Sequence, residues 1–145
     1  MTVGTFLRTF TLAHIRQLDA VSSRVLAGLA SVAPRLLART DAMAFVDVDD
    51  TICGVHGYKK QGAAYGYSGV NGLNGQLAVL PSPTSAPVIA ASRLRRCNTI
   101  CGHGGAKLIG AALATARRAG ASGQATVRAD SGHYGLELPV ISTFG

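Results

Sequence analysis

The chain has 145 residues, a length that fits a single domain. Apolar residues make up 48% of it and its mean hydropathy is +0.27, which excludes a wholly disordered protein. Lys and Arg number 14 against 7 Asp and Glu, so the net charge is +7 and the expected partner is nucleic acid or another anionic surface.

The first residues indicate a protein without a secretion signal or membrane anchor. Arg8, His14 and Arg16 interrupt every apolar stretch before the apolar run can reach the length of a signal peptide or a membrane span. The chain also has an odd number of cysteines, 3, which are expected to be reduced thiols. The predicted location is therefore the cytoplasm, with no membrane association.

A long amphipathic helix is predicted over residues 11–32. Its apolar residues recur at spacings of three and four, and Pro34 then ends the helix or starts a new turn. The residues on which this prediction depends are Leu12, Ile15, Leu18, Val25, Leu26 and Leu29.

Strands are predicted next, beginning with residues 43–52, which start with apolar, β-rich residues and end with acids. The Gly- and Tyr-rich stretch that follows is typical of hairpins, with strand candidates at residues 63–70 and 76–80. Pro81 and the prolines after it break the third strand or place it at a sheet edge. The alternating tyrosines Tyr65 and Tyr67 are expected to cover a sheet face rather than to stack on bases.

A second helix is predicted over residues 104–119, closed by glycines, and a short strand over residues 125–130. A helical crossover makes the strand after it parallel to its neighbour in the sheet. If that neighbour is the strand at residues 43–52, Asp49 and Asp130 lie side by side.

The acidic residues are concentrated where these strands end. Asp47, Asp49, Asp50 and Asp130 are four of the 7 acids, and carboxylates this close repel one another unless a cation compensates them. Carboxylates on adjacent strand ends suit Mg²⁺ or Mn²⁺, which favour oxygen ligands and support phosphoryl transfer. A metal site is therefore predicted at Asp49 and Asp130.

Strand alternation favours Asp49 as the first metal ligand. Residues two apart share a face, so Phe45, Asp47 and Asp49 point one way and Asp50 points the other. Asp50, which suits a turn or cap at the strand end, and Asp47 remain the alternates.

Five sequence blocks, in this order and at this spacing, resemble DDE-type transposases of bacterial, actinobacterial-like insertion sequences. The similarity extends over residues 4–135. The blocks are residues 44–51 (AFVDVDDT), 59–69 (KKQGAAYGYSG), 85–96 (SAPVIAASRLRR), 114–123 (ATARRAGASG) and 127–132 (VRADSG).

The resemblance implies an α/β protein with a ribonuclease-H-like fold, in which N-terminal helices precede a β-β-β-α-β mixed sheet. It divides the chain into an N-terminal helical segment (1–42), a partial catalytic domain (43–135) and a tail unlike the family (136–145). It also implies Mg²⁺-dependent DNA transposition, with transposon ends as partner and a possible homo-oligomer in the full-length family. The family's first acid, in an Asp-x-Thr element, maps onto Asp49 to Thr51, and its second maps onto Asp130.

The family's third acid, a Glu on a later helix, has no counterpart. The tail contains Pro139 and lacks a helical period, and Glu137 is too close to Asp130 in sequence to replace that acid. We therefore expect a truncated, inactive form of the transposase domain, lacking the C-terminal part of the fold, that keeps residual DNA binding.

Two alternatives remain open. The strand also fits the Asp-x-Asp-x-Thr of haloacid-dehalogenase-type phosphatases, with Asp47 as nucleophile, Asp49 as acid/base, Lys107 as phosphate clamp and Asp130 as metal ligand. The other is a DNA- or subunit-binding fragment without catalysis. The predicted DNA-contacting residues are Lys59, Lys60, Arg93, Arg95 and Arg96.

Overall fold

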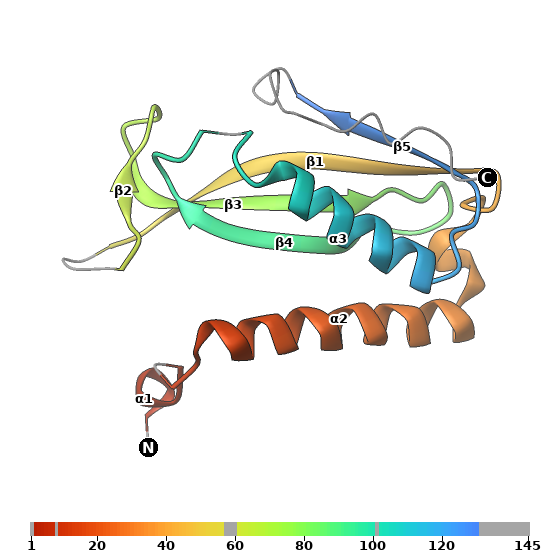
Figure 1. Ribbon diagram of the computed structural model, residues 1–145, viewed down its shortest axis with the longest axis horizontal. Helices are drawn as coiled ribbons and strands as arrows, with labels where there is room; N and C mark the ends of the chain where they lie inside the picture. The colour runs from red at the N-terminus through yellow and green to blue at the C-terminus, as the bar shows by residue number, and fades with distance from the viewer. Residues whose placement is uncertain (1, 8, 57–60, 101, 131–145) are drawn as a thin grey trace.

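A computed structural model describes residues 2–7, 9–56, 61–100 and 102–130. Three α-helices and five strands follow one another in these residues, with a short 3₁₀ helix between the second α-helix and the first strand (Figure 1). The helical elements are α1 (Val3–Leu7), α2 (Leu12–Val32), η1 (Pro34–Leu37) and α3 (Gly105–Arg118). The strands are β1 (Met43–Gly54), β2 (Ala64–Tyr65), β3 (Asn71–Leu80), β4 (Val88–Arg96) and β5 (Gln124–Ala129).

The two long helices occur where the apolar periodicity predicts them. At the start of α2 the backbone N–H of Thr11 donates a 3.0 Å hydrogen bond to Nδ1 of His14, which satisfies a donor at the helix end. Pro34 begins η1 directly after the helix, as its restricted backbone allows at a first helical position. The structure therefore confirms the helix predictions.

The packing of α2 differs from what an amphipathic helix leads one to expect. The buried residues of α2 are Ser23 and Leu26, and the helix contacts α3, η1 and β4. Four residues of the predicted apolar stripe are exposed, Ile15 by 50%, Leu18 by 51%, Val25 by 63% and Leu29 by 47%, whereas Leu26 of the same stripe is 7% exposed. On the packed side of α2 the Thr115 hydroxyl of α3 lies 3.0 Å from the Ser23 hydroxyl, and Arg118 also bonds Ser23.

The sheet is mixed. β1, β3 and β4 form an antiparallel meander, β5 pairs parallel with β1 at the other side, and the two-residue β2 pairs with the start of β3. The predicted parallel crossover is confirmed. The strand predicted at residues 63–70 is wrong in extent, since most of that stretch is turn, and β4 was not predicted at all.

The hydrophobic core lies between α3 and one face of the sheet, as the course of α3 across the strands in Figure 1 shows. The α3 face of the sheet carries Val46, Ala78 and Leu80, each at most 1% exposed, and α3 contributes Leu108 and Ile109. Alternate residues of β1 enter this core, and the residues between them point to the opposite face.

Truncating a core side chain of α3 should therefore destabilise the chain. Ile109 is 2% exposed, and Ile109→Ala should lower the free energy of unfolding by about 2–5 kcal/mol, since it removes buried methyl groups and leaves a cavity. Urea denaturation followed by circular dichroism measures this change. Ile100→Ala is the control, because Ile100 is 80% exposed and its loss should stay within about 0.5 kcal/mol. Equal losses from the two variants would contradict this assignment of the core.

The start of β1 at Met43 coincides with the predicted boundary between the helical segment and the sheet. The predicted tail, residues 136–145, and the end of the predicted catalytic domain lie outside the described residues. None of the helices in the described part of the chain combines the length and apolar character that a membrane crossing requires.

Candidate metal and nucleic-acid site

The acidic stretch of β1 places its three aspartates on two faces of the sheet. Ala44, Val46 and Val48 are buried beneath α3, so the residues between them, including Asp47 and Asp49, point to the other face. Asp50 points to the same side as the core. This agrees with the alternation expected from the sequence.

β5 ends one residue before Asp130, so its register with β1 indicates where Asp130 should lie. The parallel register pairs Asp47 with Arg128 and Val48 with Ala129, and Asp130 is the residue that directly follows β5. Extending this register by one residue sets Asp130 beside Asp49, on strands about 4.8 Å apart. The separation of the two carboxylates themselves remains a prediction.

Asp49 is exposed. One carboxylate oxygen, Oδ1, accepts a 2.8 Å hydrogen bond from the backbone N–H of Asp50, which orients the side chain locally. In the part of the chain that the structure describes, Asp49 takes part in no ion pair. Its carboxylate is therefore accessible to a cation from solvent.

Asp50, the first alternate metal ligand, belongs to a polar cluster with Asn74 and Arg95 on the sheet face that α3 covers. Its Oδ2 lies 2.7 Å from Nη2 of Arg95 and 3.2 Å from Nδ2 of Asn74, and only 13% of the Asp50 side chain is exposed. Arg95 also donates to Oδ1 of Asn74, at 2.9 Å from Nη2. These contacts give Asp50 a structural role inside β1, which continues to Gly54, so the expectation of a turn or cap at the strand end is wrong.

Asp47, the second alternate, forms a bidentate ion pair with Arg128. Nε and Nη2 of Arg128 lie 2.6 and 2.8 Å from the two carboxylate oxygens. The hydrogen bonds that Arg128 donates to Asp47 raise the pKa of the Arg128 guanidinium, with partial desolvation acting against them.

The chemistry of Asp49 and Asp130 fits a hard divalent cation. Mg²⁺ is commonly held by one or two carboxylates and keeps several water ligands, so two acids on adjacent strands suffice for weak binding. Among the described residues no group of three or more His, Cys, Asp or Glu is arranged to hold a metal. The candidate site is therefore a two-carboxylate site.

The predicted DNA-contacting arginines differ in their surroundings. Arg95 is buried, and Nη1 of Arg93 donates a 3.1 Å hydrogen bond to the Gly104 carbonyl at the start of α3. Gly104 has φ +79°, and a Cβ there would lie 2.7 Å from Nη1 of Arg93, so this contact requires glycine. Arg96 is exposed. Lys59 and Lys60 lie outside the described residues.

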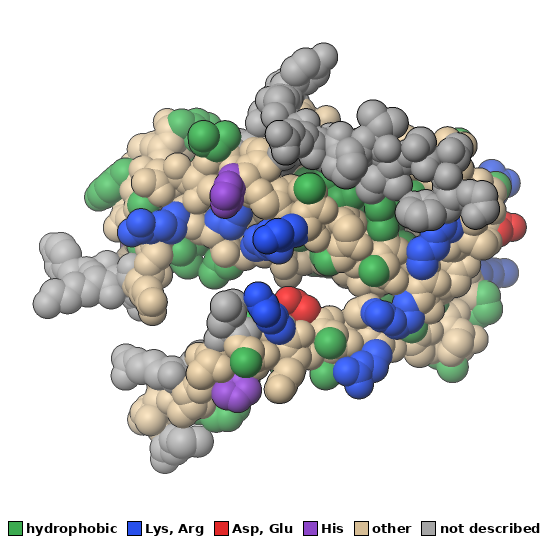
Figure 2. Space-filling view, viewed as in Figure 1, with side chains coloured by type: hydrophobic (Ala, Val, Ile, Leu, Met, Phe, Trp, Pro, Cys, Tyr) green, Lys and Arg blue, Asp and Glu red, His purple; other side chains and the backbone are tan. Residues whose placement is uncertain are grey.

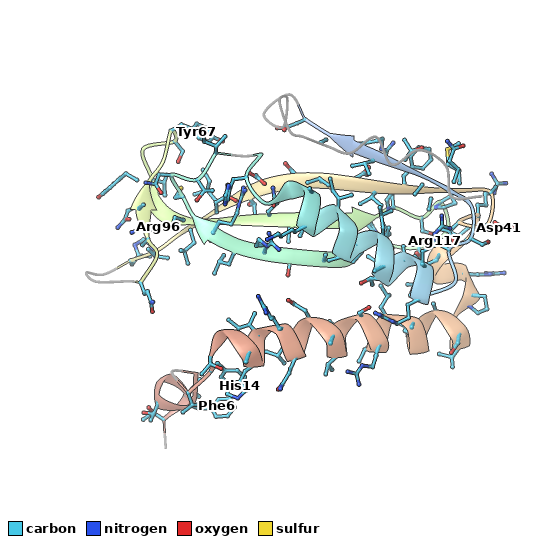
Figure 3. The ribbon with its side chains drawn as sticks, in the orientation of Figure 1. Phe6, His14, Asp41, Tyr67, Arg96 and Arg117 are labelled. Carbon is cyan, nitrogen blue, oxygen red and sulfur yellow. The ribbon has the colours of Figure 1, made fainter. Side chains whose placement is uncertain are left out.

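Two exposed tyrosines lie at the same end of the molecule as Arg96. Tyr65 is 71% and Tyr67 89% exposed, so the expectation that they cover a sheet face is wrong. Gly66 between them packs against Cys97, where a Cβ would lie 2.6 Å from the Cys97 carbonyl oxygen. This close approach places Gly66 beside the end of β4, and Figure 3 shows Tyr67 and Arg96 at that end of the molecule.

Basic side chains are also spread over the face that carries α2 and α3, with few acidic side chains among them (Figure 2). On α3 these include Lys107, which is exposed, and Arg117 and Arg118 in the last turn. Such a distribution suits a polyanion.

Comparison with known proteins finds no matching family model, no similar curated protein and no similar solved structure.

Proposed function

We propose that this chain carries two acids of a DDE-type transposase site on a partial ribonuclease-H-like fold, and that it binds DNA and a divalent cation without cutting DNA. The observation that carries the proposal is the parallel pairing of β5 with β1, whose register ends at Val48 and Ala129, the residues directly before Asp49 and Asp130. Continued by one residue, this register would set the two acids of the family motif side by side. The antiparallel meander followed by a helical crossover supports the same fold.

Asp49 and Asp130 would hold Mg²⁺ or Mn²⁺. A bound ion would supply Lewis-acid activation and charge neutralisation at a phosphodiester. The protein's own contribution is to orient the two carboxylates: the backbone N–H of Asp50 holds Asp49, and pairing with β1 positions the end of β5.

DNA binding is supported by charge and by exposed aromatic side chains. Arg96 offers a phosphate contact, and Tyr65 and Tyr67 offer ring faces on which bases can stack. Gly54 lies at the end of β1 that is nearest to β2. Asp49 is five residues before Gly54, a distance of about 17 Å along the strand. A nucleic acid held at the Arg96 end is thus within a few nucleotides of the acid pair.

The phosphatase alternative has less support. It requires a parallel sheet, whereas β3 pairs antiparallel with the motif strand β1 and also with β4. Its nucleophile, Asp47, is also engaged by the bidentate hydrogen bonds of Arg128. Magnesium-dependent hydrolysis of a small phosphate ester by the purified chain would favour this alternative.

Metal titration tests the proposed site. Mn²⁺ should bind weakly, and Asp49→Asn or Asp130→Asn should each reduce affinity by about tenfold, because either change removes one of two charged ligands. Isothermal titration calorimetry, or the electron paramagnetic resonance signal of free Mn²⁺, measures this loss.

Asp19→Asn is the matched control, since Asp19 is an exposed acid on α2, an element that belongs to neither β1 nor β5. This substitution changes net charge by the same amount and should leave Mn²⁺ affinity unchanged. If the two site variants bind Mn²⁺ as tightly as the Asp19 variant, Asp49 and Asp130 are not the ligands.

A further inference from the structure

The N-terminal half of α2 projects from the body of the molecule. Residues 13–22 are all exposed, and Figure 1 shows that α2 approaches α3 through its C-terminal half. A helical segment of this length is only marginally stable in water without tertiary packing. An uncovered apolar surface on such a segment therefore points to a partner that covers it.

The uncovered apolar residues of α2 repeat with the period of a coiled coil. Steps of three and four residues alternate along one side of the helix, which we call the outer stripe: Ile15, Leu18, Ser22, Val25, Leu29 and Val32. The apolar members are 47–79% exposed, and Ser22 is exposed as well. A stripe with this period packs against another helix that has the same period, and a second copy of the chain supplies one.

The outer stripe is large enough for a weak but specific interface. Its five apolar residues, with Val21 beside them, expose roughly 600 Å² on each copy, so pairing covers up to about 1,200 Å², the lower limit for specific protein interfaces. None of the six stripe residues is charged, so two copies can bring these surfaces together despite a net charge of +7 on each.

Two polar residues on opposite flanks of the outer stripe favour a parallel arrangement. In a parallel pair of helices with this period, His14 of one copy lies beside Asp19 of the second copy, five positions later, and the contact occurs twice. Nδ1 of His14 accepts the hydrogen bond from the Thr11 N–H, so Nε2 is left to donate to a carboxylate. An antiparallel pair does not bring these two residues together.

We propose that the outer stripe of α2 is a dimerisation surface, on which α2 of a second copy packs in parallel. Sedimentation equilibrium of the full chain should show a monomer–dimer equilibrium with a Kd on the order of 10 µM, as an interface near the lower size limit allows. Leu18→Glu and Val25→Glu should each raise this Kd at least about tenfold, because each sets two carboxylates against each other inside an apolar contact.

Ala20→Glu is the matched control, since Ala20 is exposed on α2 outside the outer stripe and the substitution adds the same charge. It should leave the Kd unchanged. Circular dichroism of each variant verifies that the chain is folded; the replaced side chains are at least half exposed, so the fold should persist. An unmodified chain that stays monomeric at about 200 µM, well above the expected Kd, would overturn the proposal. So would a dimer that both stripe variants leave intact.

Oxidative cross-linking tests the direction of the pair. In a parallel dimer each stripe position meets itself, so Val32→Cys should give a disulfide-linked dimer on a gel run without reductant. Ser31→Cys, the exposed residue next to it and outside the outer stripe, should give no more cross-linked dimer than the unmodified chain with its own cysteines. Equal cross-linking by the two variants would contradict the parallel arrangement.

Discussion

Replacing Arg95 with methionine should lower the free energy of unfolding by about 3–5 kcal/mol, because it removes one partner of a buried ion pair. Only 6% of the Arg95 side chain and 13% of that of Asp50 are exposed. The same guanidinium donates to the carbonyls of His103 at 2.6 Å and Ile100 at 3.3 Å, so it also holds the connection between β4 and α3. Methionine keeps much of the volume but leaves the Asp50 carboxylate buried without this cation. Chemical denaturation followed by circular dichroism measures the loss.

Arg96→Met is the matched control, because Arg96 is the next residue of β4 and is exposed. It removes an equal charge and should change stability by no more than about 0.5 kcal/mol. Adding Asp50→Asn to Arg95→Met should recover part of the loss, since a neutral amide is less costly to bury than a carboxylate. A loss below about 1 kcal/mol for Arg95→Met would show that the cluster beneath α3 is not held together by this pair.

The second large effect concerns catalysis: the 145-residue chain should bind DNA yet leave it intact. In-line attack on a phosphodiester requires one ion near the attacking oxygen and another near the leaving oxygen, and two carboxylates do not provide for both. Loss of such a group commonly removes several kcal/mol of transition-state stabilisation, and each 1.36 kcal/mol is about tenfold in rate. The net charge of +7 still favours binding, with affinity that falls steeply between about 50 and 200 mM salt as counterions are released.

The experiment incubates purified chain with labelled transposon-end DNA and Mg²⁺ or Mn²⁺, beside Asp49→Asn. Fluorescence anisotropy reports binding and a denaturing gel reports nicks. Salt-sensitive binding without nicks is expected for both proteins. Nicking by the chain that Asp49→Asn abolishes would mean that a third metal ligand completes the site. Nicking that persists in Asp49→Asn would point to a contaminating nuclease.

The sequence predicts well the elements that have a clear apolar period and that end at Pro or Gly. α2, α3 and β1 combine a clear apolar period with Pro or Gly at their ends, and the crossover then determines that β5 is parallel. β4 was missed because prolines precede it and because arginines follow its Val88–Ile89 start, a pattern that resembles an exposed loop. Arg93 and Arg95 of β4 bond polar partners, Arg93 the Gly104 carbonyl and Arg95 the side chain of Asn74. No local sequence pattern reveals these contacts.

The candidate site shows the same limit. Strand alternation predicts that Asp49 and Asp50 point to opposite faces of the sheet, and the structure confirms this, with Asp50 paired to Arg95 and Asp49 exposed. The role of Asp49 as a metal ligand stays a prediction. The pairing of Asp47 with Arg128 depends on register between strands distant in sequence, so composition and spacing within one strand do not disclose it. The exposure of most of the predicted stripe of α2 was equally hidden, because it depends on which side of the helix contacts α3, and that side includes Ser23, bonded to Thr115, and the stripe residue Leu26.

An anomalous-difference map from crystals grown with Mn²⁺ tests whether Asp49 and Asp130 hold one divalent cation together. We expect an anomalous peak on the open face of the sheet, within bonding distance of a carboxylate oxygen from each of the two residues. Crystals of Asp49→Asn should lose that peak. A map with Mn²⁺ bound elsewhere, or with the two carboxylates more than about 10 Å apart, would contradict a shared metal site, given the roughly 4 Å spacing of two-metal centres.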